Sequence, residues 1–139
     1  MLPGKPPMSE LSSTPLLHLN DFSVAFDGQV VVDKLSLSLN AGETLAIVGE
    51  SGSGKSVSSS AIMNLIDCPP GEIVSGEILF EGRDLLKASA AERRAINGKR
   101  IAMIFQDPLS HLNPVYTVGW QLREVMRVHG ATRVQAEER

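Results

Sequence analysis

The sequence predicts an α/β fold in which a strand, a glycine-rich loop and a helix follow one another directly. Residues 44–48, Thr-Leu-Ala-Ile-Val, form a short apolar run with β-branched members, as is typical of a buried parallel strand. The loop at 49–56 contains three glycines. Residues 57–66 follow with apolar side chains at helical spacing. This order predicts an α/β unit with its loop at the carboxyl end of the strand.

An antiparallel β subdomain is expected in front of this unit. Residues 16–26 are strand-like. Residues 30–39 alternate leucine with serine, which is the pattern of a strand with one solvent-exposed face. The Asp27-Gly28 pair between them is a strong two-residue hairpin signal. The two segments are therefore predicted to pair, with Phe26 at the tip.

The loop reads G-E-S-G-S-G-K-S, which satisfies G-x-x-x-x-G-K-[ST] at every fixed position. Glycines let the backbone curl around an anion and turn successive N–H groups inward, and the following helix start adds unpaired donors. Lys55 is predicted to reach the β- and γ-phosphates, and Ser56 to ligate Mg²⁺. We therefore expect a P-loop NTPase fold that binds a purine nucleoside triphosphate.

Composition excludes some functions and partners. Thirteen basic against 16 acidic residues give a net charge of −3, which offers no electrostatic footprint for nucleic acid. The single cysteine, Cys68, cannot form an internal disulfide, which fits a reducing compartment. Residues 1–15 are rich in proline and serine and are predicted to be a disordered tail. No run approaches the roughly 20 apolar residues that span a bilayer, so any membrane association has to involve a partner.

Three further segments have predicted structure. Residues 76–82 predict a short edge strand between glycine turns, and residues 90–96 and 118–128 predict helices. Phe26 at the hairpin end has two interpretations. An aromatic face there is suited to stacking on a base, and the alternative is a hydrophobic residue that closes the hairpin over the core.

Residues 101–105, Ile-Ala-Met-Ile-Phe, predict a second buried strand, and three interpretations of its polar end compete. An acid after an apolar run can hold Mg²⁺, which would suit Asp107. Gln106 comes first, however, and can reach the metal and the attacking water. The third interpretation is a polar strand end that only caps the strand. The residues alone leave the choice open.

Together, the hairpin aromatic, G-E-S-G-S-G-K-S-V and I-F-Q-D-P-L-S-H-L-N-P resemble the ATP-binding subunits of ABC transporters, from about Leu16 to the end. Within that family the sequences of these motifs are similar to those of the oligopeptide, dipeptide and nickel importer branch. The resemblance implies that Gln106 is the Q-loop glutamine, with a role in metal binding and hydrolysis beside Lys55, and that Asp107 is not the Walker B acid. The implied nucleotide-binding residues are Phe26, Gly49, Glu50, Ser51, Gly52, Ser53, Gly54, Lys55, Ser56 and Val57.

The family's L-S-G-G-Q signature, Walker B strand and switch histidine are not found here, and all three lie downstream in the family. We therefore expect residues 16–139 to be the N-terminal portion of an incomplete ABC ATPase domain. In the family, ATP lies between two such domains, so the chain alone is not expected to hydrolyse it. The resemblance implies ATP and Mg²⁺ as cofactors.

By the same resemblance, the implied partners are a second ATP-binding domain, transmembrane permease subunits and, indirectly, a substrate-binding protein. The implied location is peripheral, on the cytoplasmic face of the membrane, and the implied role is peptide import. Two alternatives come from other classes: an ABC ATPase without a transport role, and a small-molecule kinase. A kinase usually carries its phosphate loop near the chain start, whereas here 48 residues precede it.

Overall fold

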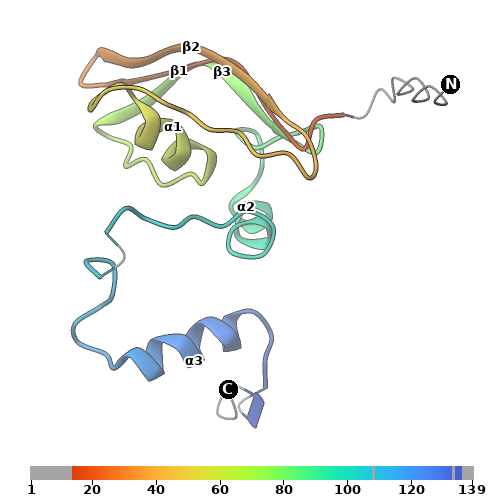
Figure 1. The fold of residues 1–139 in the computed structure, drawn as a ribbon, viewed down its shortest axis with the longest axis vertical. Coiled ribbons are helices and arrows are strands. Elements are labelled where there is room, and N and C mark those ends of the chain that lie inside the picture. The colour runs from red at the N-terminus through yellow and green to blue at the C-terminus, as the bar shows by residue number, and fades with distance from the viewer. Residues whose placement is uncertain (1–13, 108, 133, 136–139) are drawn as a thin grey trace, which may run out of the picture. The chain divides into compact units, whose positions relative to one another are not determined.

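The computed structural model describes residues 14–107, 109–132 and 134–135, so the predicted tail lies almost wholly outside the described residues. The chain divides between Ala90 and Ala91 into two compact units, each described by itself. Their elements are β1 (Leu17–Phe26), β2 (Gln29–Leu39), α1 (Lys55–Ile62), β3 (Gly71–Phe80), β4 (Arg83–Asp84), α2 (Ala90–Ile96) and α3 (Val118–Val128), and all but the short β4 are labelled in Figure 1.

The first unit is built on a four-stranded antiparallel sheet in the order β2-β1-β3-β4. Asp27 and Gly28 join β1 to β2 with φ of 50° and 79°. Positive φ at both central residues is the backbone of a turn that suits hairpin twist, so the hairpin prediction is confirmed. The predicted strand at 76–82 is wrong in its bounds and its place, because β3 starts at Gly71 and pairs with β1 along its length.

Two residues with positive φ interrupt the β1–β2 ladder, Asp21 at 45° and Lys34 at 48°. Serine hydroxyls accept hydrogen bonds from main-chain N–H groups that lose their ladder partner where the register shifts. Ser36 Oγ accepts from the Asp21 N–H at 2.9 Å, and Ser23 Oγ accepts from the Lys34 N–H at 2.9 Å. Ser36 of the alternating pattern and Ser23 of β1 therefore satisfy a bulged backbone.

The core of the first unit lies between the sheet and α1. Figure 1 shows α1 against one face of the sheet, and it contacts β2. The largest fully buried side chains are Leu19, Phe22, Val24, Ile78 and Leu85. Each such burial is worth about 1.5–3 kcal/mol, so the sheet is a firm support for the loop that leads into α1.

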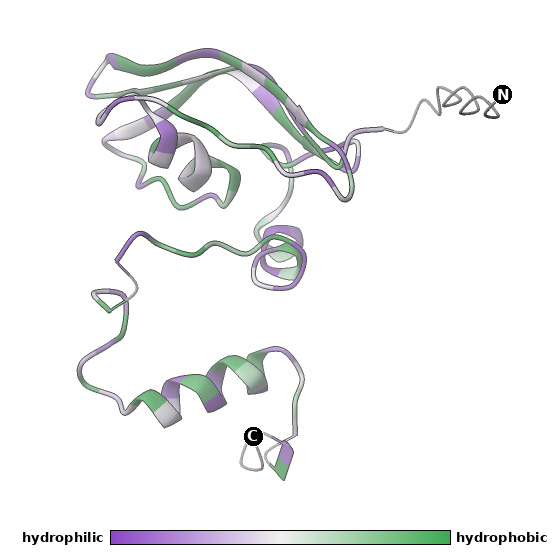
Figure 2. Ribbon diagram, viewed as in Figure 1, coloured by the Kyte–Doolittle hydropathy of each residue, from purple (hydrophilic) through white to green (hydrophobic). Residues whose placement is uncertain are grey.

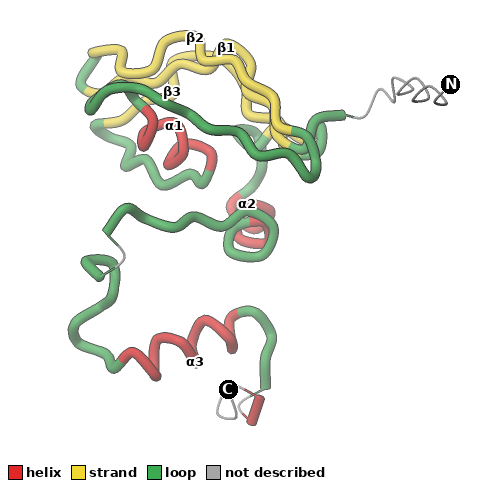
Figure 3. The backbone as a smooth tube through the Cα atoms, viewed as in Figure 1, coloured by secondary structure: helices red, strands yellow, loops and turns green. Residues whose placement is uncertain are grey.

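The two predicted buried strands, at 44–48 and 101–105, are absent from the described structure. Figure 3 draws both runs as loop, and the one bridge in them joins Ile101 to Asn97. The exposed fractions of Val48 and Ile104 are 89% and 92%. A strand needs a paired neighbour for its N–H and C=O groups, and no described strand is paired with either run. The prediction that both runs are buried strands is therefore wrong for the described residues.

In the second unit α3 has the predicted bounds. Thr117 caps it, since its Oγ1 accepts from the Trp120 N–H at 3.2 Å. Figure 2 shows apolar and polar bands alternating along α3, and none of its side chains is buried. The rings of Tyr116 and Trp120 stack with centroids 4.1 Å apart. Among the described residues no helix is long and apolar enough to cross a membrane.

Candidate phosphate-binding site

The glycine-rich loop leads directly into α1, which begins at Lys55. Gly54 caps the helix in the left-handed conformation, with φ of 86°. A Cβ on Gly54 would lie 2.8 Å from Val32 Cγ2 and 3.1 Å from the Val31 carbonyl oxygen. The position therefore requires glycine for both its φ and its close approach to β2. A Cβ on Gly49 would likewise lie 2.6 Å from Ser53 Oγ.

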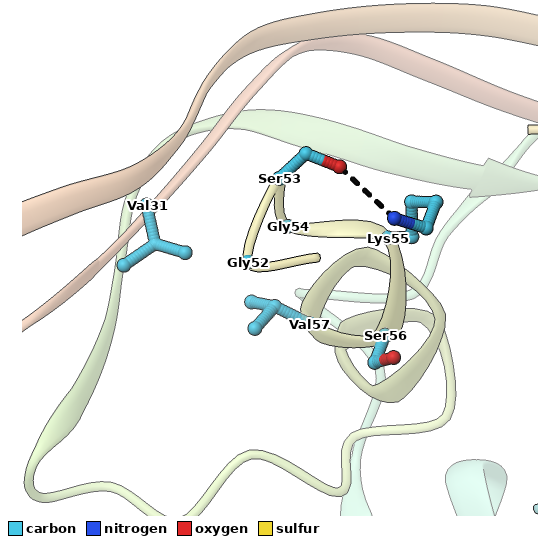
Figure 4. Close-up of a pocket in the computed structure, with 7 residues that line it drawn as sticks. All are labelled: Val31, Gly52, Ser53, Gly54, Lys55, Ser56 and Val57. Carbon is cyan, nitrogen blue, oxygen red and sulfur yellow. Dashed lines mark hydrogen bonds between the residues drawn. The ribbon is translucent and has the colours of Figure 1, made fainter. Parts of the chain in front are cut away.

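The ammonium group of Lys55 turns back over the loop (Figure 4). It donates to the carbonyl oxygens of Gly49 at 2.8 Å and Glu50 at 2.5 Å, and to Ser53 Oγ at 3.1 Å. These three contacts hold the Lys55 ammonium group above the loop that precedes α1. It is the only charged group in the first turn of this helix, all of which is described. The lysine is therefore directed at the loop rather than out into solvent.

The start of α1 supplies hydrogen-bond donors. N–H groups in the first turn of a helix have no partner inside the helix, and the dipole end is positive there. Ser58, one turn later, donates from its N–H to the Gly54 carbonyl at 2.8 Å and from its Oγ to the same oxygen at 3.0 Å. The first turn of α1, all of it described, contains no acidic side chain. An anion is therefore favoured here.

A pocket of about 180 Å³ adjoins this helix start. It is lined by Val31, Gly52, Ser53, Gly54, Lys55, Ser56 and Val57. In Figure 4 the Val57 side chain points toward the side on which Val31 lies, and Ser56 points away from both. Ser56 is exposed. Five of the seven lining residues belong to the predicted motif at 49–56, and Val57 follows it directly.

Val31 is the lining residue that sequence reasoning missed. It comes from β2, 18 positions before the motif begins at Gly49, and no local pattern marks it as a site residue. Gly54 packs against the Val31 main chain and the Val32 side chain, which brings Val31 to the loop. Together with Val57 it gives an apolar side to a pocket that is otherwise lined by glycine, hydroxyl and ammonium groups.

The donor set fits a polyphosphate with a divalent cation. A Cβ at Gly49 would collide with Ser53 and one at Gly54 with β2, so glycine at both positions lets the loop close tightly on itself and on the sheet. A backbone nest beside one lysine suits phosphate oxygens, and a serine hydroxyl is an oxygen ligand of the kind Mg²⁺ takes. The loop is therefore chemically suited to a nucleoside triphosphate and its metal.

Phe26 lies at the hairpin tip in the same unit but does not line this pocket. Its ring is half-buried, and it approaches the first residue of β3, Gly71. The structure thus places the ring beside the sheet end, as the packing interpretation expects, and leaves part of it accessible.

Gln106 and Asp107 lie in the second unit, and both are exposed. The contacts at Asp107 are made by its main chain: its carbonyl oxygen accepts from Ser110 Oγ at 2.9 Å and lies 2.8 Å from His111 Nδ1. The His111 ring stacks on Phe105 with centroids 4.1 Å apart. Among the described residues, the Asp107 carbonyl oxygen, together with Ser110 and His111, holds the turn after residues 101–105.

Comparison with known proteins gives a consistent family. Residues 32–138 match the model of the ABC transporter family. The chain is 52% identical over 120 residues to "Oligopeptide transport ATP-binding protein OppD" of Bacillus subtilis, covering 84% of this chain and 34% of that protein. It is 51% identical over 113 residues to "Dipeptide transport ATP-binding protein DppD" of Escherichia coli, covering 81% of this chain and 33% of that protein.

A third relative is "Glutathione import ATP-binding protein GsiA" of Salmonella typhimurium, 45% identical, with 94% of this chain and 23% of that protein covered. The chain thus spans about a third or less of these relatives. Among solved structures, "Structure of ATP binding subunit of ABC transporter" matches with a TM-score of 0.58 and 23% identity, over 89% of this chain and 47% of that one. That likeness confirms the fold class.

Proposed function

Because the chain belongs to the ABC transporter family, we propose that it is the nucleotide-binding part of an importer of peptides, which couples ATP binding and hydrolysis to transport. One observation carries the proposal. The G-x-x-x-x-G-K-S loop forms a glycine cradle at the start of α1, with Lys55 held over it by three hydrogen bonds. An ammonium group beside a backbone nest is the arrangement that a triphosphate requires.

The loop residues 49–57 would hold the phosphates of ATP, and Ser56 would hold Mg²⁺. The metal would supply charge neutralisation between the β- and γ-phosphates. Lys55 would exchange its carbonyl partners for phosphate oxygens, which are stronger acceptors for an ammonium group. Phe26 would stack on the adenine, since its ring is only half-buried. These roles require only groups that the first unit carries.

Gln106 would bind the metal and the attacking water beside Lys55 and would link the nucleotide to the segment that follows. That segment presents an amphipathic helix with exposed apolar side chains, which suits contact with another protein. Hydrolysis would require a second ATP-binding domain, so this chain alone would be inactive. A transmembrane permease and, through it, a substrate-binding protein would complete the assembly at the cytoplasmic face of the membrane.

The peptide substrate is proposed from the relatives, because the two most similar ones described above are named for oligopeptide and dipeptide transport. The test is affinity purification of the tagged full-length protein from detergent-solubilised membranes. We expect a permease to copurify and ATP hydrolysis to accompany the complex. Copurification with nucleic acid in place of a permease would contradict the transport role, and transfer of phosphate to a small-molecule acceptor would favour a kinase.

A further inference from the structure

The hairpin tip that carries Phe26 is tied to the segment that follows α1. Phe26 is paired with Gly71 in the β1–β3 register. Next to it, the Asp27 N–H donates to the Pro70 carbonyl oxygen at 3.2 Å, and the Gly71 N–H donates to the Asp67 carbonyl oxygen at 2.9 Å. The Asp27–Pro70 hydrogen bond and the strand pairing thus fix Phe26 relative to residues 70–71, and the Gly71–Asp67 bond holds the turn of that segment.

The close packing around Gly71 leaves no room for a side chain at this position. A Cβ built there would overlap the Cγ2 methyl of Ile66, and would lie 2.9 Å from the Asp67 carbonyl oxygen and 3.1 Å from Phe26 Cε1. Its φ is not in the left-handed region, so backbone conformation is not what requires glycine. The need for glycine comes from the close approach of Ile66, the Asp67 carbonyl oxygen and the Phe26 ring.

We propose that Gly71 is a positioning residue for the nucleotide base. Without a side chain at this position, Ile66, Gly71 and Phe26 close into one cluster, which supports one side of the ring and leaves the remainder for an adenine. The segment 63–71 begins where α1 ends, and α1 begins at Lys55, so the cluster also fixes the ring relative to the phosphate loop. This inference rests on the proposed function, because it assumes that Phe26 stacks on the base.

The test compares two probes on the full-length protein: ATP, which has a base, and inorganic tripolyphosphate, which has none. Gly71→Ala is expected to raise the Kd of ATP roughly tenfold, as expected for the loss of one base-stacking contact. The Kd of tripolyphosphate should change by less than about twofold, because the phosphate loop is untouched. Phe26→Ala should give the same pattern. In the Phe26→Ala background, the further change Gly71→Ala should raise the Kd of ATP little more.

A rescue variant separates positioning from damage. Ile66→Ala removes the methyl that a new Cβ would strike first, so the Ile66→Ala/Gly71→Ala double variant should recover part of the ATP affinity, while the Asp67 carbonyl oxygen at 2.9 Å stays in place. The same double variant serves if Gly71→Ala alone does not fold. Unchanged ATP affinity in Gly71→Ala, equal losses for both probes, or no recovery in the double variant would overturn the inference. If the wild-type protein binds neither probe, the proposed function itself is overturned, and this inference with it.

Discussion

Lys55 Nζ donates to the carbonyl oxygen of Gly49 at 2.8 Å, so the lysine of the motif is bonded to the motif's first residue. This bond closes the loop on itself across six positions. A phosphate oxygen that enters the loop has to compete with that carbonyl for the ammonium group, and an ionised acceptor is about twice as strong as a neutral one. The loop is therefore shaped for an anion before one binds.

Gly54→Ala should destabilise the protein and weaken ATP binding. The new Cβ would lie 2.8 Å from Val32 Cγ2, at a φ of 86° that L residues avoid. Overpacking and left-handed strain together predict a loss of roughly 2–4 kcal/mol in the free energy of unfolding. Urea unfolding measures this loss, and equilibrium ATP binding measures the second effect.

Gly42→Ala is the matched control for that variant. It has a similar φ of 76°, but no heavy atom lies within 4 Å of the added Cβ. Its free energy of unfolding should fall only by the roughly 1–2 kcal/mol that left-handed strain costs, and its ATP affinity should be unchanged. Equal losses in both variants would mean that the contact between Gly54 and β2 is unimportant.

Gln106→Ala should leave ATP binding nearly unchanged and should lower hydrolysis in the assembled transporter by up to roughly 100-fold, the cost of misplacing a reacting group. Asp107→Asn should alter neither, because the contacts at Asp107 come from its carbonyl oxygen, which the variant keeps. Steady-state ATPase assays on both variants decide the question. The reverse order of effects would restore Asp107 as the metal-binding acid.

Asp84 should make the stability of the first unit depend on pH. Burial raises the pKa of its carboxyl group, but hydrogen bonds from Lys87 and the Leu86 N–H more than offset this, so the pKa lies below its usual 3.8. A depressed folded pKa adds stability above the unfolded pKa, and this is lost as pH falls through the folded value. Asp84→Asn should therefore cost less than about 1 kcal/mol at pH 7, because the Lys87 partner is exposed.

The difference between the wild type and Asp84→Asn should shrink below pH 3.8, the usual pKa of the group. Urea unfolding at neutral and acidic pH measures it, with the exposed Asp33→Asn on β2 as the control. A difference that stays constant over this range would show that the charge of Asp84 contributes nothing.

Features set by neighbours in sequence could be predicted. The Asp27-Gly28 turn follows from two residues that tolerate positive φ, and the bounds of α3 follow from a capping threonine and an amphipathic repeat. The phosphate loop belongs to this class too, since its glycines, lysine and serine lie in one short stretch of sequence and five of its residues line one pocket.

Features set by distant partners could not be predicted. The runs at 44–48 and 101–105 have strand composition, but pairing is a property of the neighbour, and no described strand pairs with them. Val31 enters the pocket and Gly71 supports Phe26 only through packing between segments far apart in the sequence. The spacing of apolar residues along the sequence does not predict contacts between distant segments.

Binding of magnesium-ATP to the full-length wild-type protein and to Lys55→Ala tests the central claim most directly, with Lys87→Ala as the control for loss of a lysine. Because the loop places one ammonium group over the phosphate cradle, Lys55→Ala should raise the Kd roughly 10- to 100-fold, the value of one or two charge-assisted hydrogen bonds. Lys87→Ala should leave it unchanged. A folded Lys55→Ala variant that binds magnesium-ATP as tightly as the wild type would contradict the account.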